Sequence, residues 1–339
     1  MSIIKKISSD QFIKHNFIFF IGSMLVAFLN YLFHPVLGRM MDIESFGEVQ
    51  AILSLSLILA IFTGVFRNIV INIASNASEM EKDKETILML EKFSFYIVLS
   101  ISFLVVIFSP QLKTFFNFTS IYPFIALAVL FIFTLSLSFR QALLQGFKDF
   151  KSLSISNIIM SGGRVMFAAT LVYLGFSAFG AVSGLILAQV IALGYAFYKT
   201  KHHWRMFDSR KVKISSRIKK ELKYGLLIFI STLCITFFYS ADVIIIKHYF
   251  SPDIAGVYSG IATIARIVFF VTASVAGVLL PSIKLGEDSD NKKILKKAFV
   301  LVFCLGSLVL LTFWAFPAII VRSLIGTKYL ALSPYLPKL

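Results

Sequence analysis

Four ionisable side chains stand inside long apolar runs of the sequence. They are Arg67, Arg164, Arg266 and Asp242. In lipid such a group is costly unless it is paired or faces water, so each is a candidate functional residue. A guanidinium stays charged and grips phosphate oxygens in a bidentate fork, which makes the three arginines candidates for binding a phosphorylated substrate. Asp242, the only acidic residue deep in any run, is a candidate proton or cation site that couples transport to an ion gradient.

Each of these residues also has a structural explanation. Arg67 lies near the end of its run and can extend to the membrane interface. Arg164 can hold two helices together through a backbone or serine contact. Arg266 can pair with Asp242 on the neighbouring helix, because their expected depths differ by only about 8 Å. The functional and structural explanations both stay open at this point.

The sequence carries no pattern that indicates covalent chemistry. It contains no phosphate-cradling glycine motif and no nucleophile elbow, and the connections at 35–45 and 174–180 are too short to carry an acid–base cluster. Cys234 and Cys304 lie inside apolar runs, without a histidine at metal-ligand spacing. We therefore expect no enzyme activity, no catalytic residue, no metal and no cofactor.

The composition indicates which elements must position these residues. Hydrophobic residues make up 58% of the chain and charged residues only 15%, with a mean hydropathy of +0.86, so the solvent of this protein is lipid. Apolar runs of spanning length fall near 15–38, 46–75, 90–109, 121–147, 153–175, 179–199, 221–250, 253–283 and 296–319. These runs are continuous, which predicts an all-α polytopic membrane protein with about nine transmembrane helices and excludes a closed barrel.

The positive charges predict the orientation of these helices. Of the Lys and Arg residues in the connections, 24 lie on the side of the N-terminus and 6 on the other side, which places the N-terminus in the cytoplasm. The net charge of +16 is therefore explained by basic residues that set the orientation in the membrane, and we expect no nucleic-acid partner. A basic cytoplasmic linker at 201–220 separates a six-helix lobe at 1–200 from a lobe at 221–339 that holds helices seven to nine.

Two segments resemble each other at an offset of 209 positions. Residues 37–49 read LGRMMDIESFGEV and residues 246–258 read IKHYFSPDIAGVY, which aligns Gly47 with Gly256. Both hairpins are expected to start on the same side of the membrane, so the repeat is parallel, as in transporters built from two similar halves. The second lobe is then incomplete, residues 329–339 are expected to lead into another helix, and we expect the chain to be truncated.

Three stretches resemble the polysaccharide-export, or Wzx-type flippase, branch of the multidrug/oligosaccharidyl-lipid/polysaccharide (MOP) transporter superfamily. The first is 30–47, with Asn30, Arg39 and the Phe46–Gly47 pair; the second is 140–150, which reads RQALLQGFKDF; the third is 242–266, from Asp242 through Ala255–Gly256 to Arg266. The resemblance implies a MATE-like fold, with two lobes around a central cavity that opens to one side of the membrane at a time.

The resemblance also implies a function. Members of this branch export a polyprenyl-diphosphate-linked oligosaccharide, such as an O-antigen, capsule or exopolysaccharide repeat unit, across the bacterial cytoplasmic (inner) membrane. Arg164 and Arg266, with Arg67 below them, would give the cavity a positive field for the diphosphate. The implied partners are the lipid-linked substrate, membrane lipids, H⁺ or Na⁺, and polysaccharide polymerase and chain-length proteins.

Other functions fit the same sequence. Lipid II flippases and multidrug exporters belong to the same superfamily, a glycan polymerase or ligase would use a similar cationic groove, and a non-transporting assembly partner needs no complete pathway. Among the transporters, the charge of the cavity is the discriminating feature, because three arginines against one aspartate favour a phosphorylated lipid over a cationic drug. The first run has no acidic residue from Phe17 to Gly38, which argues against drug exporters whose cation site uses a carboxylate there.

Overall fold

The computed structural model describes residues 22–75, 80–201, 216–269 and 288–338. Within these ranges the backbone forms helices joined by short turns, and no strand occurs. The predicted all-α fold is therefore confirmed. Most of the predicted basic linker at 201–220 lies outside the described residues, as does the second part of the run at 253–283.

The described chain starts with a helix at 22–40, which we call the first helix. The other elements are α2 (Ile43–Ser75), α3 (Met80–Ile107), α4 (Ser109–Phe115), α5 (Tyr122–Gly146), α6 (Phe150–Tyr173), α7 (Ser177–Thr200), α8 (Ser216–Tyr249), α9 (Pro252–Ala265), α11 (Asp288–Ala315), α12 (Pro317–Leu324) and the 3-10 helix η1 (Thr327–Lys338). Seven of the described helices are long and apolar enough to cross a membrane. The predicted number of nine is approximate, because the runs at 15–38 and 253–283 extend beyond the described residues.

The connections between these helices are short and have identifiable stop and start signals. The side chain of Asp42 accepts a hydrogen bond from the backbone N–H of Ser45 at 3.0 Å at the start of α2. Asp149 caps α6 in the same way, accepting from the N–H of Ser152 at 3.1 Å. Gly175, with a φ of 91°, reverses the chain between α6 and α7. Between such turns a helix satisfies its backbone groups internally, as lipid requires.

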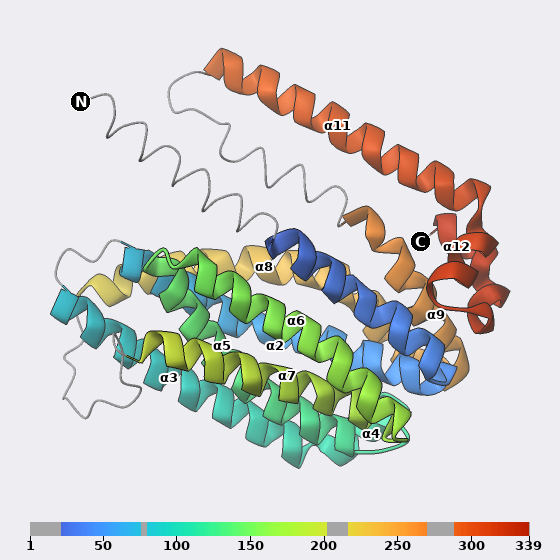
Figure 1. Cartoon of the computed structure of the whole chain (residues 1–339), viewed down its shortest axis with the longest axis horizontal. Coiled ribbons are helices and arrows are strands. Elements are labelled where there is room, and N and C mark those ends of the chain that lie inside the picture. The colour runs from blue at the N-terminus through green and yellow to red at the C-terminus, as the bar shows by residue number, and fades with distance from the viewer. Residues whose placement is uncertain (1–21, 76–79, 202–215, 270–287, 339) are drawn as a thin grey trace.

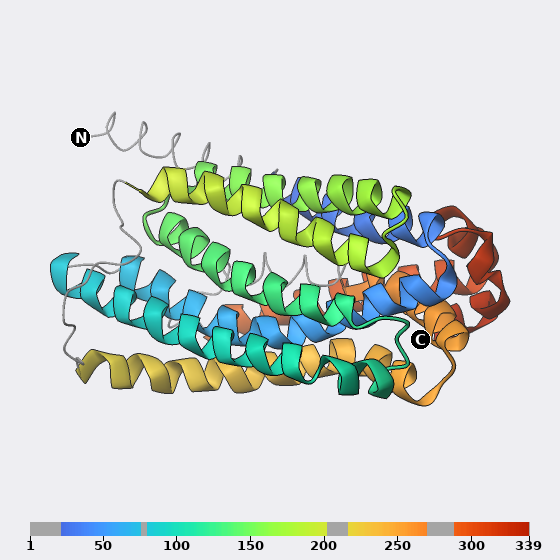
Figure 2. The ribbon, with the colours of Figure 1, turned by 90° about the horizontal axis from the view of Figure 1, so that it is seen from below.

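Most of the described helices pack into one layered bundle, whereas α11 stands apart and contacts mainly α12 and η1 (Figure 1). α2, α3, α5, α6 and α7 pack against one another, while α8 lies along α2 and α9 crosses it. Figure 2 shows α8 along one edge of the bundle and α6 and α7 along the opposite edge. α9, α12 and η1 gather where the first helix turns into α2 (Figure 1), and we call this the hairpin end. We call residues 22–201 the N-terminal part and residues 216–338 the C-terminal part.

The two segments that resemble each other in sequence lie in contact at the hairpin end. Each forms a helical hairpin, one joining the first helix to α2 and the other joining α8 to α9. A Cβ atom on Gly47 would lie 2.7 Å from the Cα of Gly256, and one on Gly256 would overlap the carbonyl oxygen of Ile43. Because no side chain fits in this space, the aligned glycines allow the backbones of α2 and α9 to touch.

The last described residues strengthen the hairpin end. Residues 329–339 were expected to lead into another helix, but up to residue 338 they belong to the 3-10 helix η1. The Nζ of Lys328 donates a hydrogen bond to the carbonyl oxygen of Met41 at 2.9 Å. The buried ring of Tyr329 packs edge-on against Phe46, with ring centres 5.8 Å apart. α12 and η1 therefore cover the turn between the first helix and α2.

We expect Gly256→Ala to lower the free energy of unfolding by about 1–3 kcal/mol, the usual cost of overpacking a filled interior. The new methyl group would force α9 away from α2. Thermal unfolding of the purified protein in detergent measures the change. Gly64→Ala is the matched control, because a Cβ atom there would meet nothing within 4 Å. Equal melting temperatures for the two variants would contradict the proposed role of this contact.

Candidate functional site

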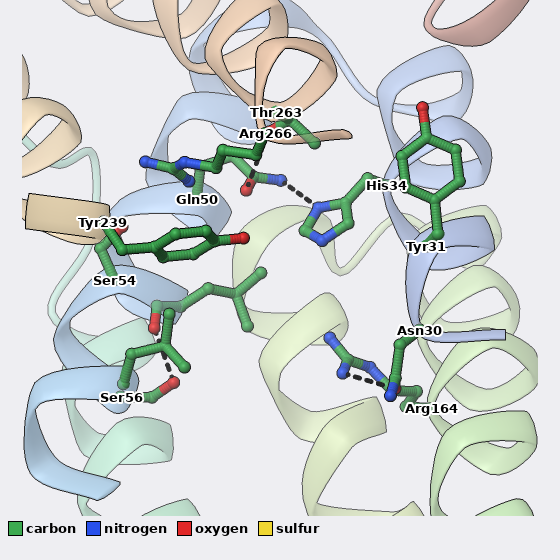
Figure 3. A pocket seen from close by; sticks show the side chains of 12 residues that line it. Asn30, Tyr31, His34, Gln50, Ser54, Ser56, Arg164, Tyr239, Thr263 and Arg266 are labelled. Atoms are coloured by element: carbon green, nitrogen blue, oxygen red, sulfur yellow. Dashed lines mark hydrogen bonds between the residues drawn. The ribbon is translucent and has the colours of Figure 1, made fainter. Parts of the chain in front are cut away.

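A cavity of about 410 Å³ lies between the N-terminal and C-terminal parts. Its wall is formed by Asn30, Tyr31 and His34 of the first helix, Gln50, Leu53, Ser54, Ser56 and Leu57 of α2, Arg164 of α6, Tyr239 of α8, Thr263 of α9 and Arg266 at the end of α9. Figure 3 shows these side chains around a common space. The cavity starts at Gln50, one turn along α2 from the glycine contact. Helices from both parts of the chain thus position the site.

Arg164 projects from α6 toward the first helix. Its Nη1 donates a hydrogen bond to Oδ1 of Asn30 at 3.1 Å, and its guanidinium carbon lies 4.4 Å from the centre of the Phe33 ring. Its buried Nε has no hydrogen-bond partner among the described residues. The structural explanation of Arg164 predicted a contact with a backbone group or a serine. The partners that the structure shows are the amide of Asn30 and the ring of Phe33. Neither carries a negative charge, so the positive charge of Arg164 remains unbalanced by them.

Arg266 is paired, as the structural explanation of its sequence position predicted. Its Nη2 lies 2.9 Å from Oδ1 of Asp242, and the guanidinium carbon lies 4.7 Å from the centre of the Tyr239 ring. The hydroxyl of Tyr258 donates to the other carboxylate oxygen of Asp242 at 3.2 Å. Arg266 and Arg164 sit on opposite sides of the cavity (Figure 3). The pair with Asp242 balances the charge of Arg266.

Arg67 lies apart from this cavity. It is half-buried in α2, and its Nη2 donates to Oε1 of Gln145 on α5 at 3.1 Å. Arg67 is absent from the residues that line the described cavity. The structure therefore brings together two of the three predicted arginines, Arg164 and Arg266, and places the third between helices of the N-terminal part.

Neutral polar residues at the hairpin-end side of the cavity join the two parts of the chain. The Nε2 of Gln50 contacts Nδ1 of His34 at 3.0 Å, and the hydroxyl of Thr263 donates to Oε1 of Gln50 at 3.4 Å. Sequence reasoning did not single out Gln50 or Thr263. The repeat contains the missed signal, because the offset of 209 aligns Thr263 with Ser54, another residue of the cavity wall.

A second ion pair, more deeply buried than the first, lies outside the cavity. The Nη2 of Arg140 on α5 lies 3.0 Å from Oε1 of Glu91 on α3, and their side chains are 1% and 9% exposed. Glu48 in α2 is also buried, with 2% exposure. Glu91 and Glu48 are the second and third residues of the predicted runs at 90–109 and 46–75, so neither lies deep in a run as Asp242 does. Burial of Glu91 and Glu48 comes from neighbouring helices, and the local sequence around each residue does not reveal it.

Most of the chain matches a known protein family. The sequence profile of a family described as polysaccharide biosynthesis proteins matches residues 12–285. The chain belongs to this family. No curated protein matches the sequence significantly. The predicted resemblance to polysaccharide-export transporters is therefore confirmed at the level of the family.

Solved transporters share the fold of this polysaccharide biosynthesis family member. An inward-facing MATE family multidrug-resistance transporter of the MOP superfamily matches with a TM-score of 0.63 at 16% identity, over 91% of this chain and 75% of that one. The MATE multidrug transporter DinF-BH matches with 0.63 at 13% identity, over 94% and 75%. A MOP superfamily transporter from Pyrococcus furiosus matches with 0.51 at 15% identity, over 96% and 78%. The protein is thus a multi-pass membrane protein with a transporter fold.

We expect Glu91→Met to lower the free energy of unfolding by about 3 kcal/mol, because it leaves the guanidinium of Arg140 buried without its counter-charge. The double variant Glu91→Met/Arg140→Met should regain most of this loss. Chemical unfolding in detergent of the wild type, Glu91→Met, Arg140→Met and the double variant gives the double-mutant cycle. A double variant no more stable than Glu91→Met would show that the two residues are not coupled.

Proposed function

We propose that the protein translocates a polyprenyl-diphosphate-linked oligosaccharide, such as an O-antigen, capsule or exopolysaccharide repeat unit, across the bacterial cytoplasmic membrane by alternating access. The observation that carries this proposal is the guanidinium of Arg164. It lines a cavity between the two parts of the chain and, among the described residues, has no acidic partner and no hydrogen-bond acceptor for its buried Nε. A phosphate oxygen would supply both the missing acceptor and the missing negative charge.

The remaining cavity wall suits the rest of such a substrate. Gln50, Ser54 and Tyr239 offer amide and hydroxyl groups that can bond sugar hydroxyls. Sugar hydroxyls and a diphosphate cannot cross hydrocarbon unaided, whereas the polyprenyl tail is as apolar as the lipid itself. A polar cavity therefore lowers the barrier for the head group while the tail stays in the membrane. No covalent step is required of the protein.

The charge pattern of the connections gives the direction. With 24 basic residues on the side of the N-terminus and 6 on the other, that terminus is assigned to the cytoplasm and the hairpin end to the opposite side. Asp242, held by Arg266 and Tyr258, is the group that we assign to coupling with H⁺ or Na⁺. Polysaccharide polymerase and chain-length proteins are the proposed downstream partners, because they act on the exported unit.

Multidrug export is the main competing function, because the MATE proteins of this fold are multidrug transporters. Fold alone does not decide the substrate. The Pyrococcus furiosus transporter is described as having a binding pocket of reversed polarity that suggests a different function, so the charge of the pocket is the better guide. Within the described part of the chain, the cavity wall holds Arg164 and Arg266 but no acidic residue, which favours an anionic head group over a cationic drug.

We expect Arg164→Ala to reduce surface polysaccharide about tenfold or more when a flippase-deficient strain is complemented, since a charge-assisted hydrogen bond to phosphate is worth roughly 1.5–3 kcal/mol. Arg266→Ala should also reduce it. Arg164→Lys should restore only part of the activity, because an ammonium keeps the charge but loses the fork. Arg322→Ala, at an exposed position, is the control. Membrane blots verify insertion, and wild-type export by Arg164→Ala would exclude this residue from the site.

For Asp242→Asn we expect weaker export and, above all, a weaker dependence of export on the ion gradient. The amide keeps the shape of the side chain but cannot take up a proton, and without the negative charge it attracts Na⁺ more weakly. Export is measured with and without a protonophore or a sodium gradient. If the dependence on the gradient is unchanged, Asp242 serves only as the structural partner of Arg266.

A further inference from the structure

A lysine at the hairpin end is completely buried. Lys247, in the last turn of α8, is 0% exposed, and its Nζ has no hydrogen-bond partner among the described residues. The ammonium lies 5.2 Å from the centre of the Phe118 ring. A buried charge that lacks hydrogen bonds is costly, and the ring compensates only part of this cost. The cavity chemistry described above makes no use of Lys247.

The nearest charges that oppose this cost come from α2. The carboxylates of Glu48 and Glu44 attract the ammonium through space. Glu48 is 2% exposed, and its Oε1 accepts hydrogen bonds from the backbone N–H of Thr119 at 2.6 Å and from the Thr119 hydroxyl at 3.0 Å. Thr119 therefore fixes this carboxylate in the N-terminal part, while Lys247 belongs to the C-terminal part.

The end of α4 and the connection that follows it contact the end of α8 beside these charges. Nδ1 of His248 lies 2.6 Å from the carbonyl oxygen of Phe115, and the two rings stack with centres 3.9 Å apart. Asn117, which has a φ of 51°, donates from its side chain to the carbonyl oxygen of His248 at 3.3 Å. We call residues 115–119, together with Glu48, Lys247 and His248, the clasp. It joins the N-terminal part to the C-terminal part.

The clasp is connected to the cavity through α8. Tyr239, which lines the cavity, and Asp242, which holds Arg266, lie on the same continuous helix as Lys247. Because α8 is a single helix, its end cannot leave the N-terminal part without moving the cavity wall. Separation of the clasp, together with the glycine contact between α2 and α9, would therefore expose the cavity at the hairpin end.

We propose that the clasp is the gate that closes the cavity at the hairpin end, and that Lys247 biases this gate toward opening. The proposal rests on the alternating access of the proposed function. In the closed gate the ammonium is dehydrated, and when the gate opens water hydrates it. The attraction of Glu48 acts in the opposite direction, because it is strongest while the gate is closed. Two residues of opposite charge thus set the ratio of open to closed molecules.

This balance gives opposite expectations for two substitutions. Lys247→Met keeps a long side chain but removes the charge, so the closed gate becomes more stable. Glu48→Gln leaves only the weaker attraction of Glu44 while Lys247 stays buried, so the gate opens more often. In the Lys247→Met background, Glu48→Gln should change the gate equilibrium little further, because the ammonium that Glu48 attracts is absent.

Distance measurements by double electron–electron resonance test the proposal. Spin labels are attached at Gln111→Cys and Ser251→Cys, two exposed positions at the hairpin end, in full-length protein in lipid nanodiscs. The two exposed natural cysteines, Cys234 and Cys304, are first replaced by serine. We expect the ratio of long to short distances to fall about tenfold in Lys247→Met and to rise in Glu48→Gln, a change of about 1.4 kcal/mol in the gate equilibrium.

Lys113→Met is the matched control, because Lys113 is a half-exposed lysine at the same end of the molecule. Shifts of Lys247→Met and Glu48→Gln in the same direction, or shifts no larger than that of Lys113→Met, would overturn the proposal. The measurement needs no substrate. Binding of farnesyl diphosphate is measured separately. If the protein does not bind it but the distance ratios of Lys247→Met and Glu48→Gln still shift in opposite directions, the proposed function fails and the gate stands.

Discussion

Where α2 and α9 cross, the backbone of Gly256 lies against Gly47 and Ile43 with no side chain between them. The cavity lies beyond this contact and is lined by the first helix, α2, α6, α8 and α9. On α2 the wall starts at Gln50, one turn after the contact, and on α9 it includes Thr263. The same contact keeps the two parts of the chain together at the hairpin end, while the polar groups gather farther along the helices.

Lipid imposes the second constraint, because it makes every buried charge expensive. This protein meets the cost in different ways. Arg140 and Arg266 have carboxylate partners at 3.0 Å and 2.9 Å, whereas the contacts of Arg164 and Lys247 with described residues include no such ion pair. The paired charges fix helices to one another. These two cations, Arg164 and Lys247, have no ion-pair partner among the described residues and lie between the N-terminal and C-terminal parts, and they are the two for which we propose that binding or movement relieves the cost.

Much of this arrangement could be predicted from the sequence. Continuous apolar runs predict the helices, because lipid allows little else, and the repeat predicts that Gly47 and Gly256 are equivalent. Arg164 and Arg266 stand out because charges inside apolar runs are rare. The burial of Glu48 and Glu91 could not be predicted in the same way, since it depends on which helices pack beside them. The contact of α12 and η1 with the turn at Met41 joins residues far apart in the chain, and no local pattern indicates it.

The repeat also shows how the cavity acquires its net charge. At the offset of 209, Asp242 corresponds to Phe33 and Arg266 corresponds to Leu57. In the C-terminal part the aspartate neutralises an arginine, while in the N-terminal part the equivalent position holds the ring that lies 4.4 Å from the guanidinium of Arg164. An aromatic face attracts a cation without cancelling its charge. Unlike side chains at equivalent positions of the repeat therefore give a cavity with one balanced and one unbalanced guanidinium, and the unbalanced one is the group to which we assign the anionic ligand.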